Sequence, residues 1–269
     1  MRNKPSNLVI LNGTALAAKE FNPGSSVSII YEVVRLMDGQ LLFLDDHLER
    51  LQNSCAKAGE KCPEKAILIS HLKVLISKAS ISNGNIRLLV YEKGGETHIA
   101  CFFVPHFYPS VEDYRNGVLT RTYSFERPEP TVKRWNEKFR RNVSKFIQQN
   151  KIYEAILLNA RGELTEGSRS NLFFIDKHSS VHTAAEKMIL PGITRKYVLQ
   201  LCKTHNFRVV EKAVSKSEAE NMKSCFISGT SPKVLPIKQL DSITYDVQDP
   251  VLKTIMDEFN QMIQNMDAQ

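Results

Sequence analysis

Residues 164–175 read Leu-Thr-Glu-Gly-Ser-Arg-Ser-Asn-Leu-Phe-Phe-Ile, and the expected fold follows outward from this stretch. An apolar run at 152–158 and a polar turn at 159–163 precede it, a pattern typical of a β-hairpin. Glu166 is then expected between two buried strands. A carboxylate there needs a cationic partner, because an unpaired buried charge is costly or is neutralised by a proton. An ordinary salt bridge with an arginine or lysine is the first interpretation.

The composition is that of a globular protein. The chain has 269 residues, of which 42% are hydrophobic and 24% charged, and this length allows one large domain or two modest ones. No apolar run approaches the ~20 residues that a membrane-spanning helix needs. The N-terminus lacks the apolar run of a signal peptide. We therefore expect a cytoplasmic protein that does not bind membranes.

Charge and cysteine content exclude further classes. The formal charge is +7, but the basic residues are scattered and no nucleic-acid-binding motif accompanies them. Nucleic-acid binding is not favoured, and attraction of small anions explains the charge equally well. The five cysteines have no CxxC spacing, so neither a disulfide framework nor a metal site is indicated.

Hydrophobic periodicity predicts strands and helices in both halves of the chain. Strands are expected at 8–11, 27–36, 40–44, 86–91, 98–104, 207–210 and 225–228. Helices are expected from Asp46, Pro63, Asn136, Gly192, Ser215 and Asp249. The fold class is α+β. It comprises a small N-terminal domain at 1–112, a linker at 113–124 and a larger C-terminal domain at 125–269.

The run Thr-Glu-Gly-Ser-Arg-Ser-Asn-Leu-Phe at 165–173 resembles the signature of the class IV aminotransferases. This pyridoxal-phosphate family includes branched-chain and D-amino acid aminotransferases and aminodeoxychorismate lyase. The resemblance implies the two-domain D-amino acid aminotransferase-like fold, with the cofactor in the interdomain cleft and bound mainly by the C-terminal domain. It also implies a homodimer, and it assigns Glu166 to the protonated pyridine nitrogen.

The same resemblance requires a lysine for the cofactor aldehyde. The family pattern is a lysine with asparagine three or four residues on, roughly twenty residues before the Tyr-Glu-Ala-Ile strand. Lys133 has Asn136 at three and Tyr153 at twenty, whereas Lys138 has Asn142 at four but Tyr153 at fifteen. Spacing favours Lys133 as the residue that forms the internal aldimine, and Lys138 is the alternative. On composition alone, Lys133 is one more surface lysine.

Other roles are carried over from matching motifs. A phosphate needs backbone N–H groups at a helix start or hydroxyls in a small-residue turn. The resemblance assigns phosphate contacts to Arg50, Ile193, Thr194, Thr230 and Ser231. It places Tyr31 on the substrate side. From the residues alone, the threonines and serine are ordinary cap and turn residues, and Arg50 is a solvated helix arginine.

The predicted activity is transfer of an amino group between an amino acid and a 2-oxo acid. The alternatives are a lyase that releases pyruvate by β-elimination, as aminodeoxychorismate lyase does, and a non-catalytic protein that retains the fold. Glu32, where the lyases tend to have threonine, favours transamination. An L-amino acid is expected, because no arginine–histidine carboxylate trap is recognised near 87–91. The segment 22–30 departs from the family pattern, so the substrate itself is not predicted.

Overall fold

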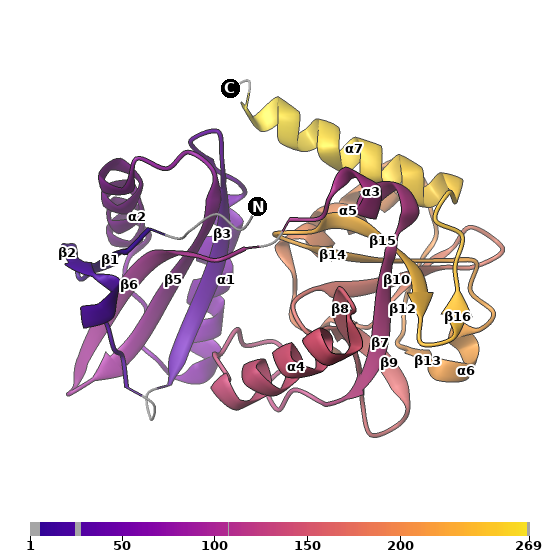
Figure 1. The fold of residues 1–269 in the computed structure, drawn as a ribbon, viewed down its shortest axis with the longest axis horizontal. Coiled ribbons are helices and arrows are strands. Elements are labelled where there is room, and N and C mark those ends of the chain that lie inside the picture. The colour runs from indigo at the N-terminus through magenta and orange to yellow at the C-terminus, as the bar shows by residue number, and fades with distance from the viewer. Residues whose placement is uncertain (1–5, 25–27, 107, 268–269) are drawn as a thin grey trace. The chain divides into compact units, whose positions relative to one another are not determined.

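The computed structural model describes residues 6–24, 28–106 and 108–267, which divide into two compact units (Figure 1). The first unit contains the described residues up to 106 and the short segment Val132–Trp135. The second contains residues 108–131 and 136–267. This division differs from the expected one at two places. The segment 113–124, expected to be a linker, belongs to a helix and a strand of the second unit, and Val132–Trp135 was expected in the C-terminal domain.

A six-stranded antiparallel sheet and two helices build the first unit, with strand order β2-β1-β6-β5-β3-β4. The elements are β1 (Leu8–Leu11), β2 (Thr14–Ala17), η1 (Ala18–Glu20), β3 (Ile29–Met37), β4 (Gln40–Leu41), α1 (Leu44–Ala58), α2 (Lys65–Ala79), β5 (Gly84–Lys93) and β6 (Glu96–Val104). Helices α1 and α2 bury Leu48 and Leu72 against sheet residues such as Ile86. Residues 25–27 lie outside the described residues, and with them the first residue of the predicted strand 27–36.

Helix α1 begins at Leu44, two residues earlier than expected. Phe43 precedes it in the left-handed conformation, with φ 53°. Asp46, expected to cap the helix, lies inside the first turn, where a carboxylate still interacts favourably with the N-terminal end of the helix dipole. The helix ends as predicted at Gly59, whose φ of 70° suits a residue without a side chain.

The second unit surrounds a ten-stranded mixed sheet. Its elements are α3 (Val111–Asn116), β7 (Val118–Ser124), α4 (Glu137–Asn150), β8 (Glu154–Leu158), β9 (Glu163–Gly167), β10 (Asn171–Ile175), β11 (Val181–Thr183), η2 (Glu186–Met188), α5 (Ile193–Thr204), β12 (Val209–Glu211), β13 (Val214–Ser215), α6 (Lys216–Ala219), β14 (Ser224–Gly229), β15 (Lys233–Leu240), β16 (Ile243–Thr244) and α7 (Pro250–Asp267). Helix α5 packs against α7 and β14, and α4 packs against β8 (Figure 1).

The predicted central hairpin closes a ring of strands. The order β10-β14-β15-β7-β8-β9 returns to β10, because Glu166 of β9 pairs with Asn171 of β10. Leu172 and Phe174 pack with Ile227 in one buried cluster of this unit. The stretch that suggested the fold therefore forms the junction at which the ring closes.

Both units combine helices and sheet, which confirms the α+β class. Within the described ranges, no helix is both long enough and apolar enough to cross a membrane.

Candidate active site

Lys133 is attached to strand β3 of the first unit. The Tyr31 N–H donates to the Lys133 carbonyl at 3.0 Å, and the Lys133 N–H donates to Ser54 Oγ at 3.2 Å. Two residues on, the Trp135 N–H donates to the Ile29 carbonyl at 2.8 Å. The segment therefore adds to the edge of β3. Its lysine Nζ lies 5.0 Å from the centre of the Tyr31 ring, within cation–π range.

The Tyr31 ring contacts both Lys133 and Trp135. Its ring packs edge-on against Trp135, with ring centres 5.4 Å apart, and only 4% of the residue is exposed. The Arg87 guanidinium also stacks on the Trp135 ring, with its Cζ 4.4 Å from the ring centre. By contrast, Lys138, the alternative lysine, is exposed in the first turn of α4 in the second unit.

Behind Tyr31, the next residue of β3 organises a buried charge cluster, which we call the Glu32 cluster (Glu32, His47 and Arg50). Arg50 donates from Nε to Glu32 Oε1 and from Nη2 to Oε2, both at 2.7 Å. His47 Nδ1 lies 2.8 Å from Oε2. All three residues are buried, so Arg50 is not the solvated helix arginine of the simpler interpretation.

The Glu32 cluster perturbs the acid–base behaviour of two of its members. Burial alone would raise the pKa of Glu32, but the Arg50 guanidinium and then His47 more than offset it, so the pKa lies well below its ordinary value. Burial lowers the pKa of His47, against the opposing effect of its bond to Glu32. At neutral pH Glu32 is an ion and His47 is uncharged, with Nδ1–H as donor.

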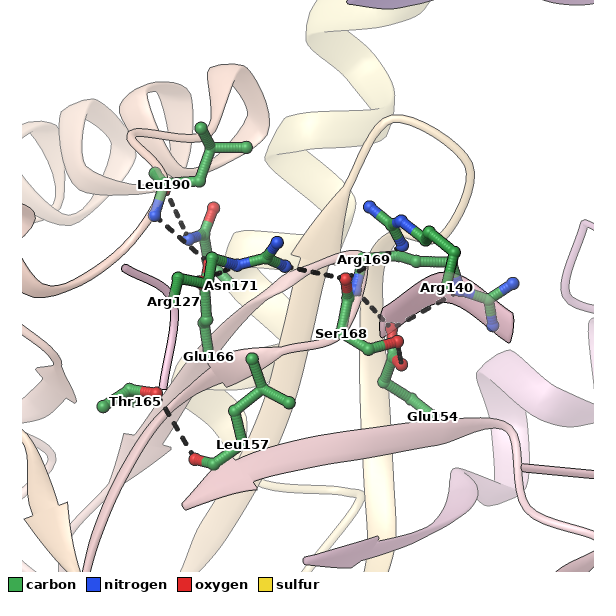
Figure 2. Close-up of polar contacts among 10 residues, drawn as sticks. All are labelled: Arg127, Arg140, Glu154, Leu157, Thr165, Glu166, Ser168, Arg169, Asn171 and Leu190. Carbon is green, nitrogen blue, oxygen red and sulfur yellow. Dashed lines mark hydrogen bonds and ion pairs between the residues drawn. The ribbon is translucent and has the colours of Figure 1, made fainter. Parts of the chain in front are cut away.

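Glu166 is buried in the second unit, and its polar partners include Arg127 and Leu190 (Figure 2). Arg127 Nε donates to Glu166 Oε1 at 2.6 Å, and the Leu190 N–H donates to Oε2 at 3.2 Å. The salt bridge expected from the sequence is therefore present. Arg127 was not predicted as a site residue, because the surrounding sequence Arg127-Pro128-Glu129-Pro130 carries no signal for this role.

The turn that follows Glu166 is held by a second buried carboxylate, Glu154. Ser168 Oγ donates to Glu154 Oε1 at 2.6 Å, and Ser170 Oγ donates to Oε2 at 3.1 Å (Figure 2). The Ala155 N–H adds a bond to Oε1 at 2.9 Å. Glu154 lay unnoticed within a predicted apolar strand. Its need for donors, and the two serines just after Glu166, were the signals that could have revealed it.

Helix α5 starts beside the same region. Asn171 Nδ2 donates to the Leu190 carbonyl at 2.8 Å, while the Leu190 N–H bonds to Glu166. Gly192 precedes the helix and provides no side-chain cap. A Cβ atom at Gly192 would lie 1.9 Å from Asn171 Oδ1, so any larger residue would displace the Asn171 side chain or the backbone at Gly192. Glu166 and Asn171 thus both bond to Leu190, three residues before α5 begins.

The end of strand β14 adds hydroxyl groups to this region. Ser228 pairs with Asn171 across the sheet, and its Oγ is fully buried without a hydrogen-bond partner among the described residues. The turn with Thr230 and Ser231 follows directly. A buried hydroxyl without a partner costs about 1–3 kcal/mol, which fits a position that receives a polar ligand.

The predicted residues therefore fall into two groups. The first unit brings Tyr31, Arg50 and Lys133 onto β3, α1 and the segment that joins β3. The second unit contains the remaining predicted residues, namely Glu166, Ile193, Thr194, Thr230 and Ser231. Ile193 and Thr194 are buried in the first turn of α5, as the sequence predicted for a helix that opens after Gly192.

The model of the family named amino-transferase class IV matches residues 29–240. This match covers most of the chain, including both groups of site residues, so the chain belongs to the class IV aminotransferases. These are pyridoxal-phosphate-dependent enzymes.

The relatives include aminotransferases and a lyase. A D-alanine aminotransferase of Bacillus licheniformis is 32% identical over 228 residues, which cover 80% of each chain. The solved branched-chain amino acid aminotransferase of Escherichia coli superposes with a TM-score of 0.82 at 20% identity, covering 95% of this chain and 94% of that one. A putative 4-amino-4-deoxychorismate lyase of Legionella pneumophila gives 0.74 at 22% identity, covering 87% and 90%. These matches confirm the predicted α+β fold of the class IV aminotransferases.

Proposed function

We propose that the chain is an aminotransferase that uses pyridoxal phosphate to move an amino group between an amino acid and a 2-oxo acid. One observation carries the proposal. In the second unit, Glu166 is connected to the start of helix α5 through Leu190 and Asn171. A carboxylate and an anion-binding helix start in one region suit a ligand that has both a basic ring nitrogen and a phosphate.

The residue types fit each group of this cofactor. The Glu166 carboxylate would accept the ring N–H. The start of α5 offers backbone donors and the positive end of its dipole to the phosphate. The hydroxyls of Thr194, Thr230 and Ser231 would add donors, and Ser228 Oγ would gain the partner that it lacks. Arg50 would also contact the phosphate, with its guanidinium plane fixed by the two bonds to Glu32.

The bound cofactor would supply an aldehyde and a ring that withdraws electrons from the amino acid Cα. Lys133 Nζ would provide the amine for that aldehyde and would then move the Cα proton as a general base. The Tyr31 ring lies beside Nζ and would line the substrate side. Glu166 would keep the proton on the ring nitrogen.

We propose an L-amino acid as the donor. In the hairpin of β5 and β6, Arg87 stacks on Trp135 and His98 stacks on Tyr91, with ring centres 5.3 Å apart. Each side chain thus has its own aromatic partner. Arg87 and His98 therefore stack on different rings, which argues against their forming the arginine–histidine carboxylate trap of a D-specific enzyme.

The test combines cofactor chemistry with a substrate panel. Purified protein should be yellow, and borohydride reduction with peptide mapping should place the pyridoxyl group on Lys133. L-amino acids should then convert 2-oxoglutarate to glutamate. Activity with D-alanine but with no L-amino acid would overturn the proposed hand. Pyruvate release from aminodeoxychorismate, without half-transamination of the cofactor, would support the lyase instead. No pyridoxal absorbance at any cofactor concentration would remove the proposal.

We further propose a homodimer, by analogy with the family. Sedimentation should give twice the mass of 30.6 kDa at assay concentrations. A fully active monomer would contradict this.

A further inference from the structure

Arg127 joins the Glu166 carboxylate to the turn that follows it. Its Nε donates to Glu166 Oε1 at 2.6 Å, and its Nη2 donates to the Ser168 carbonyl at 2.9 Å. Figure 2 shows the guanidinium between these two residues. The side chains of Arg127 and Glu166 are 18% and 4% exposed, so water screens the pair weakly. The planar guanidinium presents both donors in a fixed geometry, which a lysine ammonium does not.

Ser168, whose carbonyl accepts the second Arg127 bond, is itself held by hydrogen bonds. The Ser168 N–H donates to the Ala155 carbonyl at 2.9 Å, and Ser168 Oγ donates to Glu154. Arg140 Nη1 donates to the same Ser168 carbonyl at 3.0 Å. Arg127 and Arg140 therefore share one acceptor.

We propose that Arg127 is a positioning residue that holds Glu166 as an ion, so that a proton shared with the cofactor's ring nitrogen stays on the nitrogen. This inference rests on the proposed function. Two arrangements contain the same number of protons: a carboxylate beside a protonated nitrogen, and a carboxylic acid beside a neutral one. Moving from the second to the first breaks the O–H bond of Glu166 and forms the N–H bond, without any oxidation or reduction.

The charge of Arg127 selects between these arrangements. The guanidinium touches the carboxylate directly, whereas a nitrogen bonded to that carboxylate would lie about one hydrogen-bond length beyond it. Since electrostatic energy falls with distance, attraction to the carboxylate outweighs repulsion of the protonated ring. The Leu190 N–H on Oε2 adds to the preference for the ion. Without Arg127, burial would favour the carboxylic acid, and the ring would withdraw electrons poorly.

The first test needs no cofactor. Infrared spectra of the cofactor-free protein should show no buried carboxylic acid from Glu166 in the wild type. Arg127→Gln should gain a carboxylic acid band near neutral pH, and the double variant Arg127→Gln/Glu166→Gln should lose it. Arg140→Gln, which removes the neighbouring bond to the Ser168 carbonyl but keeps the Arg127–Glu166 pair, should look like the wild type. An unchanged Arg127→Gln spectrum would overturn the inference, as would an acid band in the wild type.

The second test reads the ring directly with pyridoxal phosphate labelled with ¹⁵N at the ring nitrogen. The wild type and Arg140→Gln should give the signal of a protonated nitrogen, and Arg127→Gln should shift toward the neutral position. Arg127→Lys should restore much of the protonated signal, because it keeps the charge but not the fork. If Arg127→Gln does not fold, a neutral nitrogen in the wild type or in Arg127→Lys still overturns the inference. Failure of the wild type to bind the cofactor would instead overturn the proposed function, and the infrared test would stand alone.

Discussion

The backbone N–H of Tyr31 donates to the carbonyl oxygen of Lys133, so the proposed catalytic lysine is attached to the edge of β3 in the first unit. The chain on both sides of Val132–Trp135 belongs to the second unit. The position of Lys133 is therefore set by hydrogen bonds to residues about a hundred positions earlier in the sequence. Lys138, five residues on, is exposed in helix α4. The two lysines therefore lie in different units and in different surroundings.

Replacing each lysine should show which one carries the cofactor. Lys133→Ala should lose the yellow colour that survives gel filtration, the borohydride-fixed label and the transamination rate. Lys138→Ala should keep all three, because its side chain is solvated. Absorbance, peptide mapping and steady-state rates measure the outcome. A label that disappears only in Lys138→Ala would show that the assignment is wrong.

Glu166→Gln should retain the cofactor but lose most of the rate. Glutamine still meets the ring nitrogen, but as a neutral partner it does not favour the protonated ring. Loss of a charge-assisted hydrogen bond of ~1.5–3 kcal/mol should slow transamination roughly ten- to a hundredfold. Cofactor affinity and single-turnover rates separate the two effects. An undiminished rate would exclude the proposed role of this carboxylate.

Glu32→Gln should strongly destabilise the first unit. It would leave the Arg50 charge buried without its ionic partner, which costs about 3–5 kcal/mol. Glu112→Gln is a matched control, because Glu112 pairs with Arg115 at 3.6 Å on the surface, with both side chains about two-thirds exposed. That change should cost less than about 1 kcal/mol. Denaturant unfolding measures both, and equal losses would contradict the buried role of Glu32.

Acid should destabilise the protein in two steps. The pKa of His47 is lowered by folding, so the unfolded chain binds a proton more readily and stability falls as pH drops below about 6.5. Burial lowers the pKa of His71 in the same direction. The pKa of Glu32 is also lowered, so its contribution is present above its ordinary value of 4.5 and is lost below it.

Unfolding measured from pH 7.5 down to about pH 2 covers both steps. His47→Gln should flatten the loss of stability between about pH 7 and 5, and His71→Gln should flatten it further in the double variant. A slope unchanged in both variants would refute the assignment.

Gly192→Ala should weaken cofactor and inorganic phosphate binding. The φ of −71° suits any residue, but the new Cβ would lie 1.9 Å from Asn171 Oδ1 and force the Asn171 side chain or the start of α5 to shift. Overpacking of this kind costs about 1–3 kcal/mol. Gly229→Ala provides the comparison, because its Cβ would come no closer than 3.3 Å, to Pro232. Titration with each ligand should show the larger loss for Gly192→Ala, and the reverse order would count against this geometry.

Patterns among neighbouring residues predicted most helices and strands. They did not predict hydrogen bonds between residues far apart in the sequence. Asn136 caps α4 and Gly192 precedes α5 as expected, because caps and periodicity are written in neighbouring residues. The assignment of Val132–Trp135 to the first unit depends on bonds to β3, which no local pattern encodes. Arg127 was missed for the same reason, since its partners lie 39 and 41 residues away.

The return of Val132–Trp135 to the first unit has a consequence for synthesis on the ribosome. One edge of β3 bonds to the later segment, through the pairs Tyr31–Lys133 and Ile29–Trp135. These bonds cannot form until Trp135 has left the exit tunnel. By then the ribosome has already made strand β7 of the second unit. The two units therefore cannot mature one after the other from the N-terminus, and a nascent chain that pauses before Val132 would display an unpaired strand edge to chaperones.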